Sequence, residues 1–160
     1  MDDALSCAFT GHRVIEERHR DGIEPLLARA IEYAYSQGVR RFYNGAAVGF
    51  DTLAARQVIR FRMTHPDVTL HMLIPCASQE ERWSERQREM YTFILSHADT
   101  VEYLSPTYYR GCMQVRNKRL VDSADMLIAY VGSETGGSAY TLGLAKKRGI
   151  LIFNLYNHIG

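Results

Sequence analysis

Short apolar runs alternate along the whole chain with longer segments in which apolar residues recur every three or four positions. The short runs stop at glycine, proline or asparagine, as strands do where a turn follows. The longer segments have the 3.6-residue spacing of helices that bury one face. The pattern predicts strands at residues 5–10, 39–43, 68–74, 100–104, 126–131 and 150–155, and helices at residues 23–34, 50–61, 90–98, 113–124 and 139–147.

The alternation of strands and helices predicts an α/β fold. Several strands are continuously apolar, which is typical of a parallel sheet that is covered on both faces. We therefore expect a Rossmann-like three-layer sandwich with a mostly parallel sheet, formed by a single domain over residues 1–160. In such sheets ligands bind beyond the carboxyl ends of the strands, where the strand order reverses. We therefore expect ligand-binding and catalytic residues in the loops that follow the strands.

Three of these loops combine glycine with small or polar residues. Glycine leaves backbone amides open to a ligand, and the helix N-terminus that follows such a loop favours anions. The alternative interpretation is a set of solvent-exposed turns and helix caps. As ligand contacts, the loops contribute Thr10, Gly11, His12 and Arg13 from the first, Gly45, Ala46, Gly49 and Asp51 from the second, and Gly136, Gly137, Ser138 and Thr141 from the third.

Two charged residues, one in the second loop and one on a predicted helix, are further candidates for ligand contact. Asp51 either caps the helix that begins beside it or binds a ligand hydroxyl such as that of a ribose, and the sequence leaves both readings open. Arg116 lies with Met113 and Leu120 on the apolar stripe of a predicted helix. A charge on a buried stripe needs a partner, which a bound phosphate or an acidic side chain would supply. The neighbouring Asn117 is counted with Arg116 as a ligand contact.

Composition narrows the function classes. With 19 Lys+Arg against 18 Asp+Glu, the net charge of +1 lacks the basic excess of a dedicated nucleic-acid binder, so nucleic acid is not an expected partner. The 3 cysteines are far apart and odd in number, which indicates reduced thiols. Neither a membrane-spanning run nor a secretory leader pattern is present, so we expect a cytoplasmic protein. The histidines lack zinc spacing, and we predict neither a metal nor a cofactor.

In their order and spacing, these motifs resemble the SLOG superfamily and, within it, the YpsA-like branch. The superfamily includes DNA-processing protein A of natural transformation and the Lonely-guy phosphoribohydrolases. The resemblance implies a Rossmann-like fold that binds nucleotides or nucleotide-derived ligands. The segments that carry it are residues 10–13, 45–51, 73–75, 116–117 and 136–141.

The Lonely-guy comparison assigns further roles. Residues 113–117 are similar to the motif M-x-x-R-K of those enzymes, and Arg116 matches its functional arginine. The family's catalytic glutamate falls at Leu142 or Gly143, which carry no carboxylate for acid–base work. Glu134 and Asp51 are the nearest substitutes.

Three functions follow as hypotheses. The first is a sensor or binding module for a nucleotide or nucleotide-sugar. The second is a hydrolase of a nucleotide N-glycosidic bond, with Glu134 or Asp51 as the acid/base beside Arg116. The third is a protein that binds single-stranded DNA. The tyrosine-rich residues 103–109 line either a pocket or an oligomer contact, which leaves a homo-oligomer open.

Overall fold

The computed structural model describes residues 3–159. Strands and helices alternate over this length, as the sequence predicts. The strands are β1 (Leu5–Gly11), β2 (Val39–Asn44), β3 (Thr69–Ile74), β4 (Thr100–Tyr103), β5 (Met126–Tyr130) and β6 (Leu151–Asn154). The helices are α1 (Ile23–Ser36), α2 (Phe50–Arg62), α3 (Glu85–His97), α4 (Cys112–Asp122) and α5 (Gly137–Arg148), with the short 3-10 helices η1 (Glu17–His19) and η2 (Tyr156–His158).

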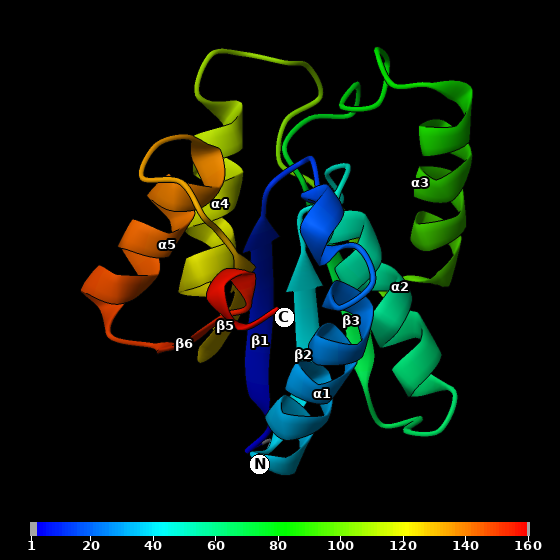
Figure 1. Cartoon of the computed structure of the whole chain (residues 1–160). Coiled ribbons are helices and arrows are strands. Elements are labelled where there is room, and N and C mark those ends of the chain that lie inside the picture. Colours follow the sequence, from blue (N-terminus) through cyan, green and yellow to red (C-terminus); the bar gives the residue numbers. More distant parts are fainter. Residues whose placement is uncertain (1–2, 160) are drawn as a thin grey trace.

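All six strands are parallel and form one sheet in the order β4-β3-β2-β1-β5-β6. The chain moves outward from β1 to β4, then crosses back and continues from β5 to β6 on the other side of β1. The predicted Rossmann-like α/β fold is therefore confirmed, and the strand order reverses between β1 and β5. Figure 1 shows α4 and α5 on one face of the sheet, and α1, α2 and α3 on the other.

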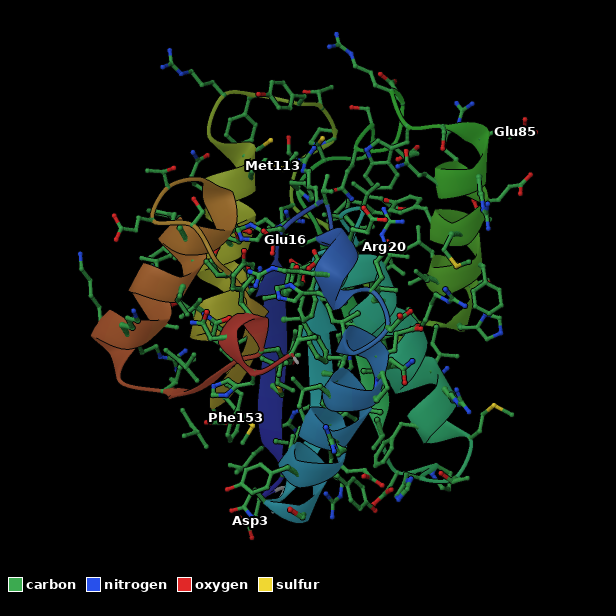
Figure 2. The ribbon with its side chains drawn as sticks, viewed as in Figure 1. Asp3, Glu16, Arg20, Glu85, Met113 and Phe153 are labelled. Atoms are coloured by element: carbon green, nitrogen blue, oxygen red, sulfur yellow. The ribbon has the colours of Figure 1, made fainter. Side chains whose placement is uncertain are left out.

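Parallel strands bring all their carboxyl ends to one edge of the sheet, which we call the carboxyl rim. Figure 2 shows Glu85 and Met113, at the beginnings of α3 and α4, towards this end of the molecule, while Asp3 lies at the opposite end. Every helix begins at the carboxyl rim, because each one carries the chain back to the start of the next strand. The rim therefore gathers the N-termini of all five helices.

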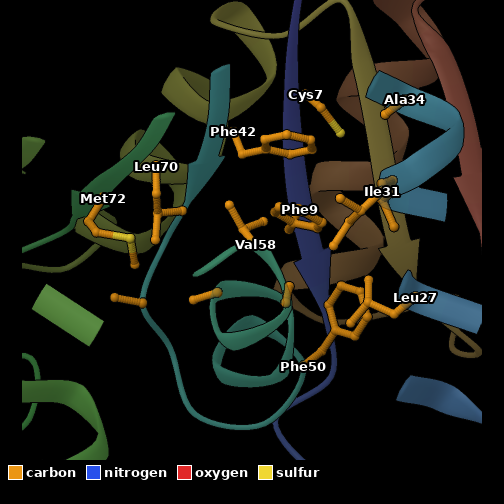
Figure 3. Close-up of a cluster of buried hydrophobic side chains, with 14 of the residues drawn as sticks. Cys7, Phe9, Leu27, Ile31, Ala34, Phe42, Phe50, Val58, Leu70 and Met72 are labelled. Carbon is orange, nitrogen blue, oxygen red and sulfur yellow. The ribbon is translucent and has the colours of Figure 1, made fainter. Parts of the chain in front are cut away.

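Aliphatic and aromatic side chains fill the larger core, between the sheet and α1 and α2 (Figure 3). Phe9 of β1 stacks on Phe42 of β2, with ring centroids 5.8 Å apart, and meets Phe50 edge-on at 6.4 Å. Phe50 is the first residue of α2 and also stacks on Tyr130 of β5 at 5.9 Å. These contacts fix the beginning of α2 against the two central strands, directly below the carboxyl rim.

The core on the opposite face is smaller and rests on small residues. Ala8 of β1 and Ala129 of β5 are fully buried there, together with Leu120 of α4 and Ala145 of α5. Alanine on the sheet lets helix backbones approach closely, and so α4 and α5 pack against the sheet and against each other. This packing brings the first turns of both helices to the carboxyl rim.

One helix begins earlier than its apolar pattern predicts. The sequence places the start of α3 at Met90, whereas the structure begins it at Glu85. The cause is a capping box: the Ser84 hydroxyl accepts from the Gln87 amide at 3.2 Å, and the Gln87 side chain accepts from the Ser84 amide at 3.0 Å. The first turn of α3 is polar and solvent-exposed, so hydrophobic periodicity does not reveal it.

The three cysteines are unpaired and buried. Within residues 3–159, no helix combines the length and the apolar character that crossing a bilayer requires. The same described residues contain no cluster of three or more His, Cys, Asp or Glu side chains with a metal-binding arrangement.

Candidate functional site

The loop after β1 packs against the beginning of α2. The amide of Phe50 donates to the carbonyl of His12 at 3.1 Å, and a side chain at Gly11 would collide with the Phe50 ring. Gly49 has a φ of 81°, and a Cβ there would overlap the backbone of Arg13. Both glycines are therefore required by close approach, which places Arg13 and the first turn of α2 side by side on the carboxyl rim.

Asp51 is not the cap of α2, because the helix begins at Phe50 with Gly49 as its N-cap. The carboxylate instead turns back into the preceding loop and is only 6% exposed. Its Oδ2 accepts from the Ala47 amide at 3.3 Å, whereas its Oδ1 has no hydrogen-bond partner among the described residues. Burial raises the pKa of Asp51 to about 6, although the charge of Arg116 and the Ala47 amide act in the opposite direction.

Arg116 is buried on α4, with 5% of its surface exposed. Its Nη1 donates to the Gly45 carbonyl at 2.6 Å and its Nε donates to Asn117 Oδ1 at 3.0 Å. Its Nη2 meets only the sulfur of Met113, at 3.8 Å. Burial lowers the pKa of Arg116 and the charge of Asp51 raises it. No ion pair joins the two in the described part of the chain, so each retains unused hydrogen-bonding capacity.

His12 connects the loops after β1 and β5. The Gly132 amide donates to His12 Nε2 at 2.8 Å, and Ser138 Oγ lies 3.2 Å from His12 Nδ1. Because a backbone amide can only donate, Nε2 must be the unprotonated nitrogen, and the neutral ring carries its proton on Nδ1. The Ser138 hydroxyl then accepts from His12, and its own proton is free to donate to a third group.

The remaining predicted residues have different surroundings. Gly136, with a φ of 102°, precedes Gly137 at the exposed start of α5. Thr141 is buried, and its hydroxyl donates to the Gly137 carbonyl at 2.9 Å, which makes it an internal contact of the helix. Thr10 is buried within β1, and Glu134 is exposed in the loop before α5.

A further polar group on the same rim was not anticipated from the sequence. Gln79 donates through Nε2 to the Ala46 carbonyl at 3.3 Å, so the segment between β3 and α3 contacts the loop after β2. Burial raises the pKa of Tyr91, and the charge of Glu80 contributes in the same direction. Among the described residues, the buried side-chain polar atoms that lack a partner are Asp51 Oδ1, Gln79 Oε1, Glu80 Oε2 and Tyr91 OH.

This distribution is informative because buried polar atoms without partners are rare in folded proteins. All four belong to the segments that follow β2 and β3, and the Gln79–Ala46 hydrogen bond joins these segments. The rule that directs attention to strand ends would also have selected residues 77–84. Their polar composition is typical of a solvated loop, however, and only the folded structure shows that polar atoms of Gln79 and Glu80 are buried there, as is the hydroxyl of Tyr91 in α3.

A cavity of about 380 Å³ opens beside the loop after β1. Arg13 and Gly49 are the two predicted site residues that line it, and the remainder of the wall comes from the approach to α1 and from the first turns of α1 and α2. The lining residues are Arg13, Val14, Ile15, Arg20, Ile23, Glu24, Gly49 and Leu53. The predicted Gly136–Ser138 segment lies outside this cavity.

The model of the YspA SLOG family (YpsA) matches residues 9–149, which run from the last residues of β1 to the end of α5 and include the loops that follow β1, β2, β3 and β5. The chain belongs to this family. A UPF0398 protein of Halalkalibacterium halodurans is 36% identical over 129 residues, covering 79% of this chain and 68% of that protein. A UPF0398 protein of Bacillus thuringiensis (strain Al Hakam) is 30% identical over 152 residues, covering 89% of this chain and 83% of the relative.

Two solved structures share the fold. DNA processing protein A of Streptococcus pneumoniae superposes with a TM-score of 0.67 at 15% identity, over 94% of this chain and 50% of the other. The Helicobacter pylori protein, whose structure is titled for its single-stranded DNA binding mode, gives 0.65 at 21% identity over 94% of this chain and 64% of the other. This chain thus spans only half to two thirds of those proteins, and the likeness shows the fold alone.

Proposed function

We propose that this member of the SLOG family binds a nucleotide or nucleotide-derived ligand at the carboxyl rim, as a sensor or binding module. The ligand lies where the strand order reverses between β1 and β5, which is the usual binding place in open parallel sheets. Its phosphate is held by Arg116, and a sugar hydroxyl donates to Asp51.

One observation carries the proposal: the buried carboxylate of Asp51 and the buried guanidinium of Arg116 act on each other electrostatically but form no ion pair. Asp51 Oδ1 lacks a donor, and Nη2 of Arg116 lacks an oxygen acceptor. A ligand that offers a hydroxyl on one side and an anionic oxygen on the other satisfies both groups at once. Leaving such groups unsatisfied costs about 1–3 kcal/mol each, and that cost is recovered when the ligand binds.

The loop after β5 supplies a further contact. His12 directs the free proton of the Ser138 hydroxyl away from its own ring, and Gly136 and Gly137 present backbone amides without side chains in front of them. Hydroxyl and amide donors at a helix N-terminus suit a phosphate oxygen. In this arrangement, the walls of the site are formed or held in place by Gly11, Gly45, Ala46, Gly49 and Asn117.

Asp51 also favours a second function, the hydrolysis of a nucleotide N-glycosidic bond. A carboxyl group with a pKa of about 6 is suited to proton transfer near neutral pH. Of the two acid–base candidates, Asp51 has this perturbed environment beside Arg116, while Glu134 is exposed. Incubation of each bound nucleotide with the protein, followed by chromatography for the free base, separates turnover from binding.

Single-stranded DNA is the third ligand to test, because a solved structure of the same fold is titled for binding it. The near-neutral charge of this chain argues against a large electrostatic contribution. A titration with labelled oligonucleotide at two salt concentrations distinguishes the two ligands. Nucleotide binding without salt-dependent DNA binding supports the first function, and the reverse result supports the third.

The direct test measures melting temperature with adenosine and guanosine nucleotides. We expect a nucleotide to raise the melting temperature of the wild-type protein, and we expect Asp51→Asn and Arg116→Lys to reduce that rise. Lys118→Ala is the matched control, because Lys118 is an exposed residue of α4 that pairs only with Asp122. An unchanged shift in both site variants, or no shift with any nucleotide, would overturn the proposal.

A further inference from the structure

The cavity beside the loop after β1 is lined by two arginines to which the proposed function assigns no ligand contact. Arg13 and Arg20 both line it. Both residues are exposed, and neither guanidinium forms a hydrogen bond or an ion pair with another described residue. Most exposed arginines are simply solvated. Here, however, two of them border one concave space whose inner wall is formed by the buried side chain of Ile23 and by Leu53.

The cavity adjoins the Asp51–Arg116 pair. Gly49 lines the cavity and lies two residues before Asp51, and the backbone of Arg13 packs directly against it. The charge of Arg13 acts on the titration of both Asp51 and Arg116, which places its guanidinium within electrostatic reach of both. Arg13 therefore lines the cavity and also acts electrostatically on the Asp51–Arg116 pair.

We propose that this cavity binds a second phosphate of the same ligand, with Arg13 between the two phosphates and Arg20 at the outer one. The inference rests on the proposed function and narrows its ligand class to nucleoside diphosphates over monophosphates. Planar guanidinium groups suit phosphate oxygens because they donate two parallel hydrogen bonds. The first turns of α1 and α2, which border the cavity through Ile23, Glu24 and Leu53, add a favourable field for an anion.

The cavity also contains one group that opposes an anion. Glu24, in the first turn of α1, is the acidic residue among those that line it. Two guanidinium groups against one carboxylate leave a net positive charge, so a phosphate is still attracted. The carboxylate nevertheless weakens that attraction. A variant that removes the charge of Glu24 is therefore expected to bind a phosphate more tightly, whereas a variant that removes an arginine is expected to bind it more weakly.

Isothermal titration with AMP and ADP, and with GMP and GDP, tests the inference. We expect the diphosphate to bind the wild-type protein about tenfold more tightly than the monophosphate, as one charge-assisted contact predicts. Arg20→Ala is expected to remove most of that difference while leaving monophosphate affinity unchanged. Glu24→Gln is expected to increase the difference.

Arg18→Ala is the matched control. Arg18 is exposed, two residues before Arg20, and it contacts Glu16 and Tyr156 rather than the cavity. It should change neither affinity. Equal affinity for mono- and diphosphates, or an Arg20→Ala effect of equal size on both, would overturn this inference while leaving the proposed function intact. If neither class binds the wild-type protein, both proposals fail.

Discussion

Arg116 Nη1 donates a 2.6 Å hydrogen bond to the carbonyl of Gly45, which joins two residues 71 positions apart in the chain. The bond ties the first half of α4 to the loop that follows β2. A Cβ at position 45 would come within 2.6 Å of that same Nη1, so the loop accommodates the guanidinium only because it lacks a side chain there. Arg116 is therefore both a ligand candidate and a structural contact of the carboxyl rim.

Arg116→Ala should lower the free energy of unfolding by about 3 kcal/mol, because it removes the buried hydrogen bonds to Gly45 and Asn117. Urea denaturation followed by circular dichroism measures the change. Lys118→Ala, on the exposed side of the same helix, should stay within about 0.5 kcal/mol of the wild-type protein. Equal effects of the two substitutions would contradict a structural role for the buried hydrogen bonds of Arg116.

Asp51→Asn should stabilise the protein at pH 7.5 and should do so much less at pH 4. The folded-state pKa of about 6 exceeds the ordinary aspartate value of 3.8, so the folded state binds the proton more tightly than the unfolded state does. The stability that Asp51 contributes is consequently greatest below pH 4 and is lost as the pH rises through 6. The shift corresponds to a gain of up to about 3 kcal/mol for the uncharged variant at neutral pH.

Thermal denaturation of Asp51→Asn and wild-type protein between pH 4 and pH 7.5 checks this expectation. The difference between the two should grow with pH and level off above pH 6. A difference that is constant over this range would show that Asp51 titrates normally. If Asp51→Asn is more stable than the wild-type protein and also loses the nucleotide-induced rise in melting temperature, Asp51 serves binding rather than folding.

Gly49→Ala should destabilise the protein by about 3 kcal/mol or more, because its positive φ is combined with overlap of a Cβ with the Arg13 backbone. Gly149, which ends α5 with a φ of 76°, has open space around its missing Cβ. Gly149→Ala should therefore cost only about 1 kcal/mol, from backbone strain alone. Chemical denaturation of both variants separates the two causes, and equal losses would contradict the close approach at Gly49.

His12→Ala should loosen the loop after β5, since the Gly132 amide then loses its acceptor and Ser138 loses its donor. Hydrogen exchange measured by NMR should be about tenfold faster at the Gly132 amide, as the loss of one hydrogen bond predicts. His158→Ala replaces an exposed histidine and should leave that exchange unchanged. Slow exchange at Gly132 in His12→Ala would show that the ring does not hold the loop.

The fold could be predicted from the sequence because its elements have distinct hydrophobic periods. The fully buried β5 is a continuous apolar run, and the helices carry regular stripes. The limits of α3 could not be taken from apolar spacing, since its start is set by hydrogen bonds between Ser84 and Gln87. That signal, Ser followed three residues later by Gln, is present in the sequence.

The candidate site was only partly predictable. A charge on an apolar stripe correctly indicated that Arg116 is buried, but its protein partners are the Gly45 carbonyl and Asn117 rather than an acidic side chain. Glycines indicated where backbones approach closely. The unpartnered atoms of Gln79 and Tyr91, and the cavity at Arg20, depend on how separate segments meet in space. Exposed and buried polar residues look alike in a loop sequence, so these features required the folded structure.

The crossover from β4 to β5 also affects when the site can form during synthesis. β2, β3 and β4 each pair with the strand made just before them, but Met126 of β5 pairs with Cys7 of β1. A nascent chain that has not yet added β5 leaves one edge of β1 unpaired, and α4, which carries Arg116, lacks the β5 side chains that complete its hydrophobic cluster. If the proposed function holds, nucleotide binding would therefore begin only once β5 has paired with β1, so it would report that this late strand has been added.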